Sequence, residues 1–230
     1  MRYNRIFLLL FATLTLLCAC QHAQAANKAV DTRFTDSLTF LGDSITAHME
    51  SRADVRAAQI WASKARYLNL DSRITYAKIV APDTGEEELI ADVAARIRPP
   101  YLLVALGVDY GVYYYRNEPQ TFAKYYEKLL DALSAASPDT KILLQSVLPV
   151  AESCKALTNE MIDRTNTVIR EIAARRGLSY LDTQSVLRDE NGFLRAEYCY
   201  SEDGIHLTAK AYTAILNYIN AQAGEQGWTV

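Results

Sequence analysis

The chain has 230 residues, of which 24 are Lys or Arg and 27 are Asp or Glu, giving a formal net charge of −3. Because acidic and basic residues are mixed along the sequence, without a basic stripe or an acidic tail, the charge pattern excludes a nucleic-acid-binding protein of the usual cationic kind. There is no glycine-rich phosphate loop, and no cluster of acidic, His or Cys residues with cation-binding spacing. The sequence therefore predicts no metal and no nucleotide or other cofactor.

Residues 1–25 have the pattern of an export signal. Arginines precede an almost unbroken apolar run from Ile6 to Leu17, which is too short to span a bilayer comfortably, and small residues follow. The segment that ends at Cys20 resembles a bacterial lipobox, whereas Ala23-Gln24-Ala25 fits ordinary signal peptidase, so both cleavage sites stay open. Either one predicts an exported protein of the bacterial envelope, which is periplasmic or is attached to the membrane through a lipidated Cys20.

Residues 26–36 are polar and predict a linker, which leaves residues 37–230 for one folded domain. In this domain, short apolar runs alternate with amphipathic stretches. Strands are expected over residues 37–41, 73–80, 101–108, 141–148 and 178–181, and helices over 59–68, 83–97, 119–135, 158–176 and 208–222. Pro99-Pro100 and Gly177 are typical residues at the end of a helix, and they mark two of these boundaries.

The run from Tyr101 to Val108 is apolar throughout, as expected for a strand that is buried on both faces of a parallel sheet. Strands that alternate with helices imply right-handed crossovers, so the sequence predicts a three-layer α/β/α sandwich around a mostly parallel sheet of about five strands. The functional loops of such sheets gather at the carboxyl ends of the strands. Ser44, Asp109, Pro149 and Asp182 each follow a predicted strand and should therefore share one rim.

A candidate nucleophile and its candidate base lie near opposite ends of this domain. Ser44 follows the first predicted strand in a Gly-Asp-Ser turn, and Asp203 and His206 form an Asp-x-x-His motif just before the last predicted helix. This spacing lets the carboxylate hydrogen-bond one imidazole nitrogen while the other nitrogen faces the serine. We therefore predict a catalytic triad of Ser44, His206 and Asp203. Asp43 is expected to hold the nucleophile turn, and His48 is a competing base.

The segments Gly42-Asp43-Ser44-Ile45-Thr46 and Asp203-Gly204-Ile205-His206-Leu207-Thr208 together resemble the SGNH (GDSL) hydrolase family of serine esterases, and the resemblance runs from Ser37 to about Ala221. It implies a flavodoxin-like α/β/α fold and ester hydrolysis through an acyl-enzyme on Ser44. It also implies an oxyanion hole with three donors. These are the N–H of the serine, the N–H of a glycine after the second strand, and an asparagine side chain after the third.

Two of these three donors differ in this chain. Asp109 stands where the family commonly shows asparagine, and an ionised carboxylate has no proton to give to an oxyanion. Direct alignment places Pro82, which has no N–H, at the family's glycine, and Gly85 could replace it after a loop adjustment. Because one lost donor typically costs about 10²–10³ in rate, the sequence leaves open whether the chain is an efficient enzyme or a very slow one.

Cys154 and Cys199 remain after either cleavage. In an oxidising compartment this pair predicts either a disulfide or two free thiols, and both stay open. A bridge would tie the loop after the fourth predicted strand to the segment that carries Asp203 and His206. Tyrosines crowd the same predicted rim and could stack on sugar rings or line an acyl groove. They are Tyr110, Tyr113, Tyr114, Tyr115, Tyr198 and Tyr200.

From these residues we expect an exported serine esterase that removes short acyl groups, such as acetyl, from a carbohydrate or a cell-envelope glycan. The expected partner is a small-molecule or glycan ester, and no nucleic acid is expected. A lysophospholipase or thioesterase of the same family stays open as an alternative. So does a catalytically silent carbohydrate-binding or envelope-assembly protein, which Asp109 and Pro82 favour and the intact Ser44, Asp203 and His206 argue against.

Overall fold

The part of the chain that the structure, a computed structural model, describes is residues 33–229, and a parallel sheet lies at its centre. Five strands are ordered β2-β1-β5-β6-β7, and all neighbours pair in parallel. Their bounds are β1 Leu38–Gly42, β2 Ile60–Trp61, β5 Tyr101–Ala105, β6 Lys141–Gln145 and β7 Ser179–Leu181. Two further strands, β3 Lys78–Val80 and β4 Glu87–Leu89, form a separate antiparallel ribbon. The predicted export signal and Cys20 lie outside the described residues.

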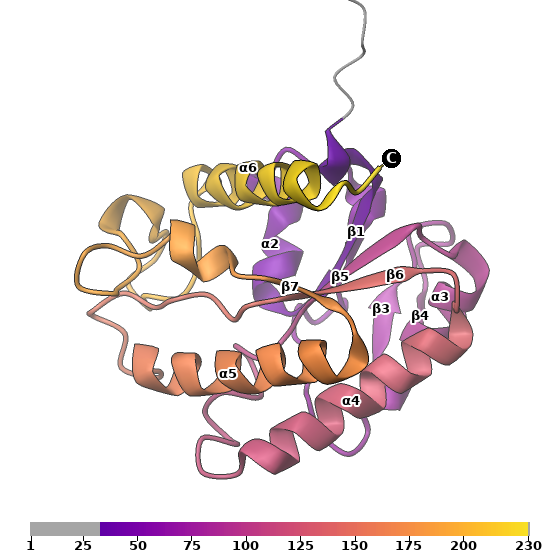
Figure 1. Cartoon of the computed structure of the whole chain (residues 1–230), viewed down its shortest axis with the longest axis horizontal. Coiled ribbons are helices and arrows are strands. Elements are labelled where there is room, and N and C mark those ends of the chain that lie inside the picture. Colours follow the sequence, from indigo (N-terminus) through magenta and orange to yellow (C-terminus); the bar gives the residue numbers. More distant parts are fainter. Residues whose placement is uncertain (1–32, 230) are drawn as a thin grey trace, which may run out of the picture. The chain divides into compact units, whose positions relative to one another are not determined.

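Helices cover both faces of the sheet, with α2 and α6 on one face and α3, α4 and α5 on the other (Figure 1). Their bounds are α2 Ser44–Arg52, α3 Ile90–Ile97, α4 Pro119–Ala136, α5 Asn159–Arg176 and α6 Ala209–Gln226. Short 3₁₀ helices are η1 Phe34–Ser37, η2 Ala57–Gln59, η3 Ile74–Tyr76, η4 Thr183–Val186 and η5 Ala196–Tyr198. The predicted three-layer α/β/α sandwich is confirmed. Within residues 33–229, none of the helices is both long enough and apolar enough to cross a membrane.

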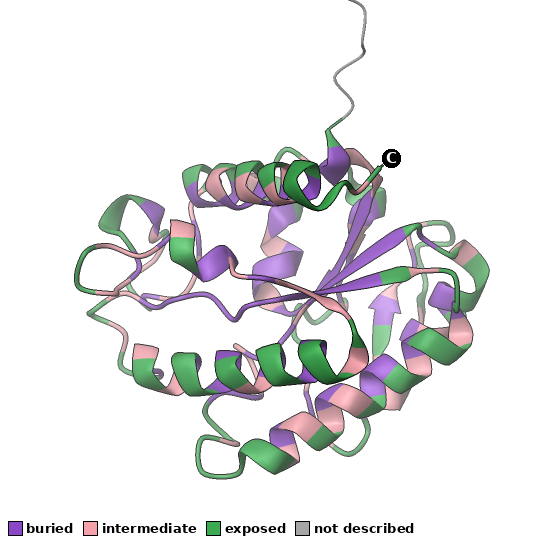
Figure 2. Cartoon of the chain, viewed as in Figure 1, coloured by how far each residue is buried: buried purple, intermediate pink, exposed green. Residues whose placement is uncertain are grey.

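Side chains of the central strands alternate between two cores, because successive residues of a strand point to opposite faces. On β1, Leu38 and Phe40 pack with α2 and α6, whereas Leu41 packs on the side of α3, α4 and α5. On β5, Leu103 and Val104 divide in the same way. Figure 2 shows the result as buried strands between helices whose outward faces are exposed. A sheet covered on both faces explains why the central strand β5 is apolar at every position.

The three long helices begin within one residue of their predicted starts, because their sequences carry end signals. The helices α4 and α5 also end within one residue of their predicted ends, whereas α6 continues to Gln226, four residues beyond its predicted end. The Thr158 hydroxyl accepts a hydrogen bond from the Met161 N–H at the start of α5, and Gly177 follows its last residue. Thr208 caps α6 in the same way, through the N–H of Ala211. A threonine in this position satisfies one of the N–H groups that a helix start leaves without a partner.

The segment after α2 differs from its prediction. Residues 59–68 do not form a helix, since Ile60 and Trp61 make the edge strand β2 and the Trp61 side chain is fully buried. The Gln59 side chain also donates to the carbonyls of Thr35 and Leu38, which fixes the strand beside β1. Burial of a tryptophan against the sheet thus outweighs the helical pattern. The fold also begins earlier than predicted, because Phe34 and Thr35 are buried and so belong to the domain rather than to a linker.

The predicted strand at residues 73–80 and the predicted helix at 83–97 are each correct only in part. Residues 74–76 form η3, and Lys78–Val80 pairs with Glu87–Leu89 instead of joining the main sheet. This ribbon uses the residues that would have begun the helix, so α3 starts only at Ile90. The second strand of the parallel sheet is therefore β2 and not the segment at 73–80.

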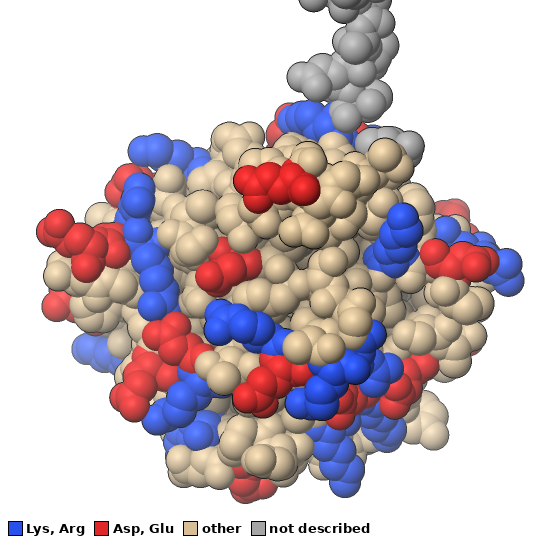
Figure 3. Space-filling model, in the orientation of Figure 1, with Lys and Arg blue, Asp and Glu red and all other residues tan. Residues whose placement is uncertain are grey.

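Lys and Arg lie beside Asp and Glu across the face shown in Figure 3. Two of the ion pairs join α4 to α5, from Arg175 to Glu127 at 3.1 Å and from Arg176 to Asp131 at 2.5 Å. Exposed pairs of this kind each contribute about 0–1 kcal/mol, so packing rather than charge holds the two helices together.

Candidate active site

The candidate nucleophile Ser44 is the first residue of α2 and lies directly beyond the carboxyl end of β1. The turn between strand and helix requires glycine at position 42. A Cβ atom there would lie 2.0 Å from the Thr46 hydroxyl oxygen and 2.5 Å from the Ala105 carbonyl oxygen, so only a residue without a side chain fits. Asp43 caps α2 by accepting the Ile45 N–H. The local sequence thus fixes Ser44 at the rim of the sheet.

Asp109 contacts Ser44 directly. Its Oδ2 atom accepts the Ser44 backbone N–H at 3.0 Å, and its Oδ1 atom accepts the Ser44 hydroxyl at 2.8 Å. The loop after β5 therefore meets the turn after β1, as the shared-rim prediction requires. The carboxylate binds the nucleophile and also the N–H that the family resemblance assigns to the oxyanion hole. In this conformation Asp109 holds the resting serine, and the hydroxyl is not hydrogen-bonded to a histidine.

A second carboxylate, Asp43, lies beneath this contact and is 3% exposed. Its Oδ2 atom accepts the backbone N–H groups of Gly107 at 3.2 Å and of Val108 at 3.1 Å, which ties the turn after β1 to the loop after β5. Burial raises the pKa of Asp43 to about 7, and the negative charge of Asp109 adds to this rise, while the backbone N–H bonds act against it. Asp43 is thus a structural group, and it carries a proton over much of the acidic range.

The raised pKa of Asp43 predicts a specific dependence of stability on pH. The folded state keeps this proton up to about pH 7, whereas the unfolded chain releases it near its ordinary value of 3.8, so the folded state binds more protons in between. The stabilisation is therefore complete below pH 3.8 and is lost as pH rises through 7. Between pH 5 and 8, the free energy of unfolding of the wild type should fall relative to that of Asp43→Asn by roughly 2–3 kcal/mol. Urea unfolding at the two pH values measures this difference, and equal slopes in the two proteins would refute it.

The candidate base is built within one short loop. Asp203 Oδ2 lies 2.6 Å from His206 Nδ1, and Asp203 Oδ1 accepts the N–H groups of Ile205 at 2.7 Å and of His206 at 3.1 Å. Burial acts to raise the pKa of Asp203, but hydrogen bonds from the Ile205 N–H, the His206 ring and the His206 N–H outweigh it and hold the pKa well below its ordinary value. Asp203 is therefore an anion that fixes one ring nitrogen of His206, and Nε2 is left for proton transfer.

The Asp-x-x-His loop is held against the loop that follows β6. Gly204 has a φ of +74°, and a Cβ atom there would lie 2.9 Å from the Cβ of Cys154. Glycine between Asp203 and His206 thus permits both the turn and this close approach. The Ala151 N–H donates to the Gly204 carbonyl at 2.8 Å, so backbone hydrogen bonding joins the two loops.

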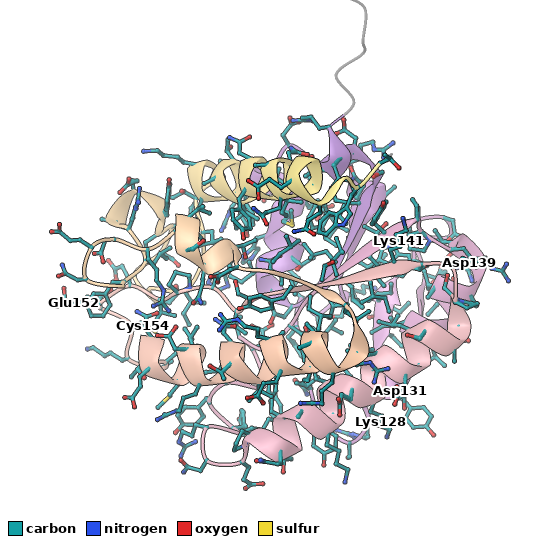
Figure 4. The ribbon with its side chains drawn as sticks, viewed as in Figure 1. Lys128, Asp131, Asp139, Lys141, Glu152 and Cys154 are labelled. Carbon is teal, nitrogen blue, oxygen red and sulfur yellow. The ribbon has the colours of Figure 1, made fainter. Side chains whose placement is uncertain are left out.

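The disulfide considered from the sequence is absent, because Cys154 and Cys199 are both free. Cys154 lies on the loop before α5 (Figure 4), packed against Gly204, while the Cys199 thiol donates to the Ser201 carbonyl at 3.1 Å. The two sulfur atoms therefore contact different residues and are not bonded to each other. Of the two open alternatives, the structure shows two free thiols, and packing and backbone hydrogen bonds join the two loops instead of a bridge.

His48 lies one helical turn after Ser44 and beside the candidate base. The His48 and His206 ring centroids are 4.7 Å apart, with an angle of 61° between the ring planes. Burial lowers the pKa of His48 to about 4, with the neighbouring His206 as the next cause, so His48 is neutral near pH 7. This contact places His206 beside the helix that begins with Ser44. His48 has no carboxylate partner, so His206 remains the better candidate base.

The proposed glycine donor of the oxyanion hole is engaged elsewhere. The Gly85 N–H donates to the Ala81 carbonyl at 2.8 Å, in a turn where Gly85 has a φ of +75°. This N–H can reach an oxyanion only if the turn opens, and Pro82 has no N–H to offer. The structure thus brings together Ser44 and Asp109 but does not make Gly85 a donor. Sequence reasoning did not foresee that Asp109 would accept hydrogen bonds from both groups of Ser44.

Two cavities border this rim. The smaller, of about 20 Å³, is lined in part by Asp43, Ile45, Val108, Pro149 and Ile205, so the ends of β1, β5 and β6 and the loop of the base meet there. The larger, of about 370 Å³, lies along α2 and beside the turn of Pro82 and Gly85. Its lining includes the charged residues Glu50, Lys64 and Arg66.

Solved structures share this fold at low sequence identity. A Streptococcus pneumonia protein, proposed to be a platelet activating factor, has a TM-score of 0.56 and 16% identity, covering 96% of this chain and 99% of its own. The acetyl xylan esterase AlAXEase has a TM-score of 0.52 and 15% identity over 80% of this chain and 98% of its own. A carbohydrate esterase family 3 protein from Talaromyces cellulolyticus has a TM-score of 0.50 and 15% identity, with coverages of 82% and 96%. None of the curated proteins matches this chain.

The sequence profile of the GDSL-like lipase/acylhydrolase family matches residues 40–214. This span covers most of the described domain and contains the Gly-Asp-Ser turn, Asp109 and the Asp-x-x-His loop. The chain therefore belongs to the GDSL-like lipase/acylhydrolase family and is a carboxylic ester hydrolase.

Proposed function

We propose that this chain is an exported serine esterase that removes short acyl groups, in particular acetyl, from a carbohydrate or a cell-envelope glycan. The observation that carries the catalytic part is the 2.6 Å contact between Asp203 and His206 Nδ1, in a loop that packs against the helix of Ser44. Ser44 is the nucleophile, His206 the general base and acid, and Asp203 the group that orients the imidazole and stabilises its charged form.

The reaction begins when the Ser44 hydroxyl turns from Asp109 toward His206 Nε2. As Ser44 Oγ bonds to the ester carbonyl carbon, Nε2 takes the hydroxyl proton. Collapse of the tetrahedral intermediate expels the alcohol, which receives that proton from His206, and leaves the acyl group on Ser44. Water then attacks the acyl-enzyme with the same base, releasing the acid and restoring the serine. The hydrogen bond between Ser44 and Asp109, 2.8 Å long, must break in the first step.

The cavity beside Asp43, Ile45 and Ile205 holds about 20 Å³, which is room for about one water molecule. Neither Ser44 nor His206 lines it, so it does not set the length of the acyl group. The ester panel below distinguishes the short-acyl esterase from the lysophospholipase and thioesterase alternatives.

Aromatic and charged groups around the rim support a sugar as the alcohol part of the ester. Tyr113, Tyr114 and Tyr200, on the loops after Asp109 and before Asp203, are about half exposed or more. Exposed aromatic faces of this kind stack on sugar rings, while charged side chains in the larger cavity can bind hydroxyl groups. The structural neighbours named as an acetyl xylan esterase and a carbohydrate esterase are consistent with this proposal.

A panel of esters tests the proposed substrate class. The described domain with its preceding linker, residues 26–230, should hydrolyse p-nitrophenyl acetate faster than the butyrate and octanoate esters, and it should release acetate from acetylated xylan. Faster turnover of octanoate or of a lysophospholipid would replace the proposal with the lipid-directed alternative. Binding to acetylated xylan without release of acetate would replace it with the silent carbohydrate-binding protein, which the contact of Asp109 with Ser44 favours.

Export is the second part of the proposal, and it depends on residues 1–25, with their basic start and apolar run. Cleavage before Cys20 would give a lipid-anchored protein, and cleavage after Ala25 a periplasmic one. Mass spectrometry of the N-terminus of the mature protein distinguishes a lipidated Cys20 from a free Ala26. An N-terminus at Met1 would contradict export.

A further inference from the structure

One face of α2 points toward the loop of the candidate base. Ser44, His48 and Arg52 are four residues apart in turn, so they lie along the same side of the helix. The first of them is the candidate nucleophile, and the other two contact the segment 198–208. The His48 ring packs against His206, and the Arg52 guanidinium reaches Leu207 and Tyr200.

The base loop is tied together by its own hydrogen bonds. The Tyr200 N–H donates to the His206 carbonyl at 2.7 Å, and the Thr208 N–H donates to the Tyr198 carbonyl at 2.9 Å. Cys199 and Leu207 pair across these two short segments as an antiparallel bridge. The contacts of Asp203 close the turn between them. These bonds fix the shape of the loop, but none of them fixes its position relative to Ser44.

Arg52 contacts both segments that pair in this antiparallel bridge. Its Nη1 atom donates to the Leu207 carbonyl at 3.1 Å, and its Cζ atom lies 3.6 Å from the centroid of the Tyr200 ring. A planar guanidinium can stack on an aromatic ring and still donate hydrogen bonds in its own plane, which a lysine ammonium cannot do with the same geometry. Leu207 is the residue directly after His206, so this contact acts next to the base.

His48 supplies the second contact, one helical turn closer to the nucleophile. Its ring meets His206 edge to face at 4.7 Å. Because His48 is neutral near pH 7, it can support an imidazolium on His206 without repelling it. A third link holds the helix that follows the loop, since the buried Tyr212 of α6 donates its hydroxyl to the Ile45 carbonyl at 2.7 Å.

On the basis of the proposed roles of Ser44 and His206, we propose that His48 and Arg52 are positioning residues that hold the His206 imidazole in register with Ser44. Both project from the helix that begins with the nucleophile, so they position the base relative to the element that carries Ser44. Neither touches the substrate in this proposal. They keep His206 close enough to Ser44 to take the serine proton when the Ser44 hydroxyl turns away from Asp109.

Arg52→Ala tests the outer contact on the enzyme of residues 26–230. A displacement of 1 Å at a catalytic group can cost about 10²-fold, so we expect kcat for p-nitrophenyl acetate to fall roughly tenfold or more while KM stays within about twofold. Arg52→Lys should recover only part of the loss. The matched control is Arg56→Ala, because Arg56 also donates to a backbone carbonyl, that of Asp36, but away from the base loop. It should lose some thermal stability and keep the wild-type kcat.

His48→Phe and His48→Ala test the inner contact. Phenylalanine keeps an aromatic edge against His206 and removes the ring nitrogens, so kcat should stay near the wild-type value, whereas alanine should lower it roughly tenfold. Because both residues position one base, the double variant of His48→Ala and Arg52→Ala should lose less than the product of the single losses. An equal loss in His48→Phe and His48→Ala would show that the imidazole itself reacts and would overturn positioning by packing.

A separate readout distinguishes failure of this proposal from failure of the proposed function. The rate at which a fluorophosphonate labels Ser44 reports activation of the serine and does not need turnover of an ester. If His206→Ala labels as fast as the wild type, the proposed base is wrong. If His206→Ala abolishes labelling but folded His48→Ala and Arg52→Ala label at the wild-type rate, only the positioning roles are wrong. Slower labelling in all three variants, with normal labelling in Arg56→Ala, supports both.

Discussion

Replacing Ser44 by alanine should lower kcat for p-nitrophenyl acetate by about 10³–10⁴. Removal of the nucleophile from an efficient triad costs about 10⁶. We expect this chain to start from a lower rate, because the Asp109 carboxylate stands where the family resemblance places one oxyanion donor and such a loss costs about 10²–10³. Steady-state hydrolysis by the wild type and Ser44→Ala, each checked for an unchanged circular dichroism spectrum, measures the difference.

Two controls make the Ser44 result specific. Ser51→Ala removes another serine from the same helix, one that is exposed, and it should leave kcat unchanged. The double variant of Ser44→Ala and His206→Ala should be no slower than Ser44→Ala alone, because a triad acts as one unit. Full activity in Ser44→Ala would place ester hydrolysis at another nucleophile and refute the proposed mechanism.

Asp109→Asn should raise kcat by about 10²–10³, the usual value of one oxyanion-hole donor. The Asp109 carboxylate now accepts both the N–H and the hydroxyl of Ser44 and would repel an oxyanion formed beside them. An amide at this position can offer N–H donors, carries no charge and releases the Ser44 N–H for the oxyanion. The same assay measures the gain, and most of it should appear in kcat rather than KM, because the oxyanion exists only after the attack.

The gain in Asp109→Asn must depend on the nucleophile, so it should vanish when Ser44→Ala is added. If Asp109→Asn is instead more than about tenfold slower than the wild type, the carboxylate that binds the Ser44 hydroxyl serves as its proton acceptor. An inactive wild type with an active Asp109→Asn would identify a silenced hydrolase. The direction and size of the change in kcat therefore distinguish three interpretations of Asp109. The carboxylate impairs the oxyanion hole, it accepts the proton of Ser44, or it silences the wild-type enzyme altogether.

The long elements of the fold could be predicted from the sequence because they carry their own end signals. Thr158 and Gly177 bound α5, and the apolar run from Tyr101 predicted the central strand β5. Residues 59–97 could not be predicted equally well. Their short strands depend on partners far along the chain, since Trp61 is a strand residue only because β1 lies beside it. A local pattern contains no information about such a partner.

The candidate site, like the fold, could be predicted from the sequence only in part. The Asp-x-x-His spacing predicted the contact of Asp203 with His206, because three residues suffice for one turn. The role of Asp109 as an acceptor for Ser44 required knowledge of how two loops meet in space. The role of Arg52 was not predicted from the sequence, although its spacing from Ser44 indicates it. Arg52 lies two helical turns after Ser44, and this spacing becomes informative only when residues 44–52 are known to be a helix.

The order of the site along the chain has a consequence for biosynthesis. Ser44 follows the first strand of the sheet, whereas His206 and the helix that anchors its loop come last. A ribosome completes the nucleophile turn long before it adds the base, so the nascent chain carries a serine that nothing activates. A polypeptide cleaved between β5 and β7 likewise leaves the two halves of the site on separate fragments. If Ser44 and His206 have the proposed roles, esterase activity therefore requires a folded chain that contains both β1 and the loop before α6.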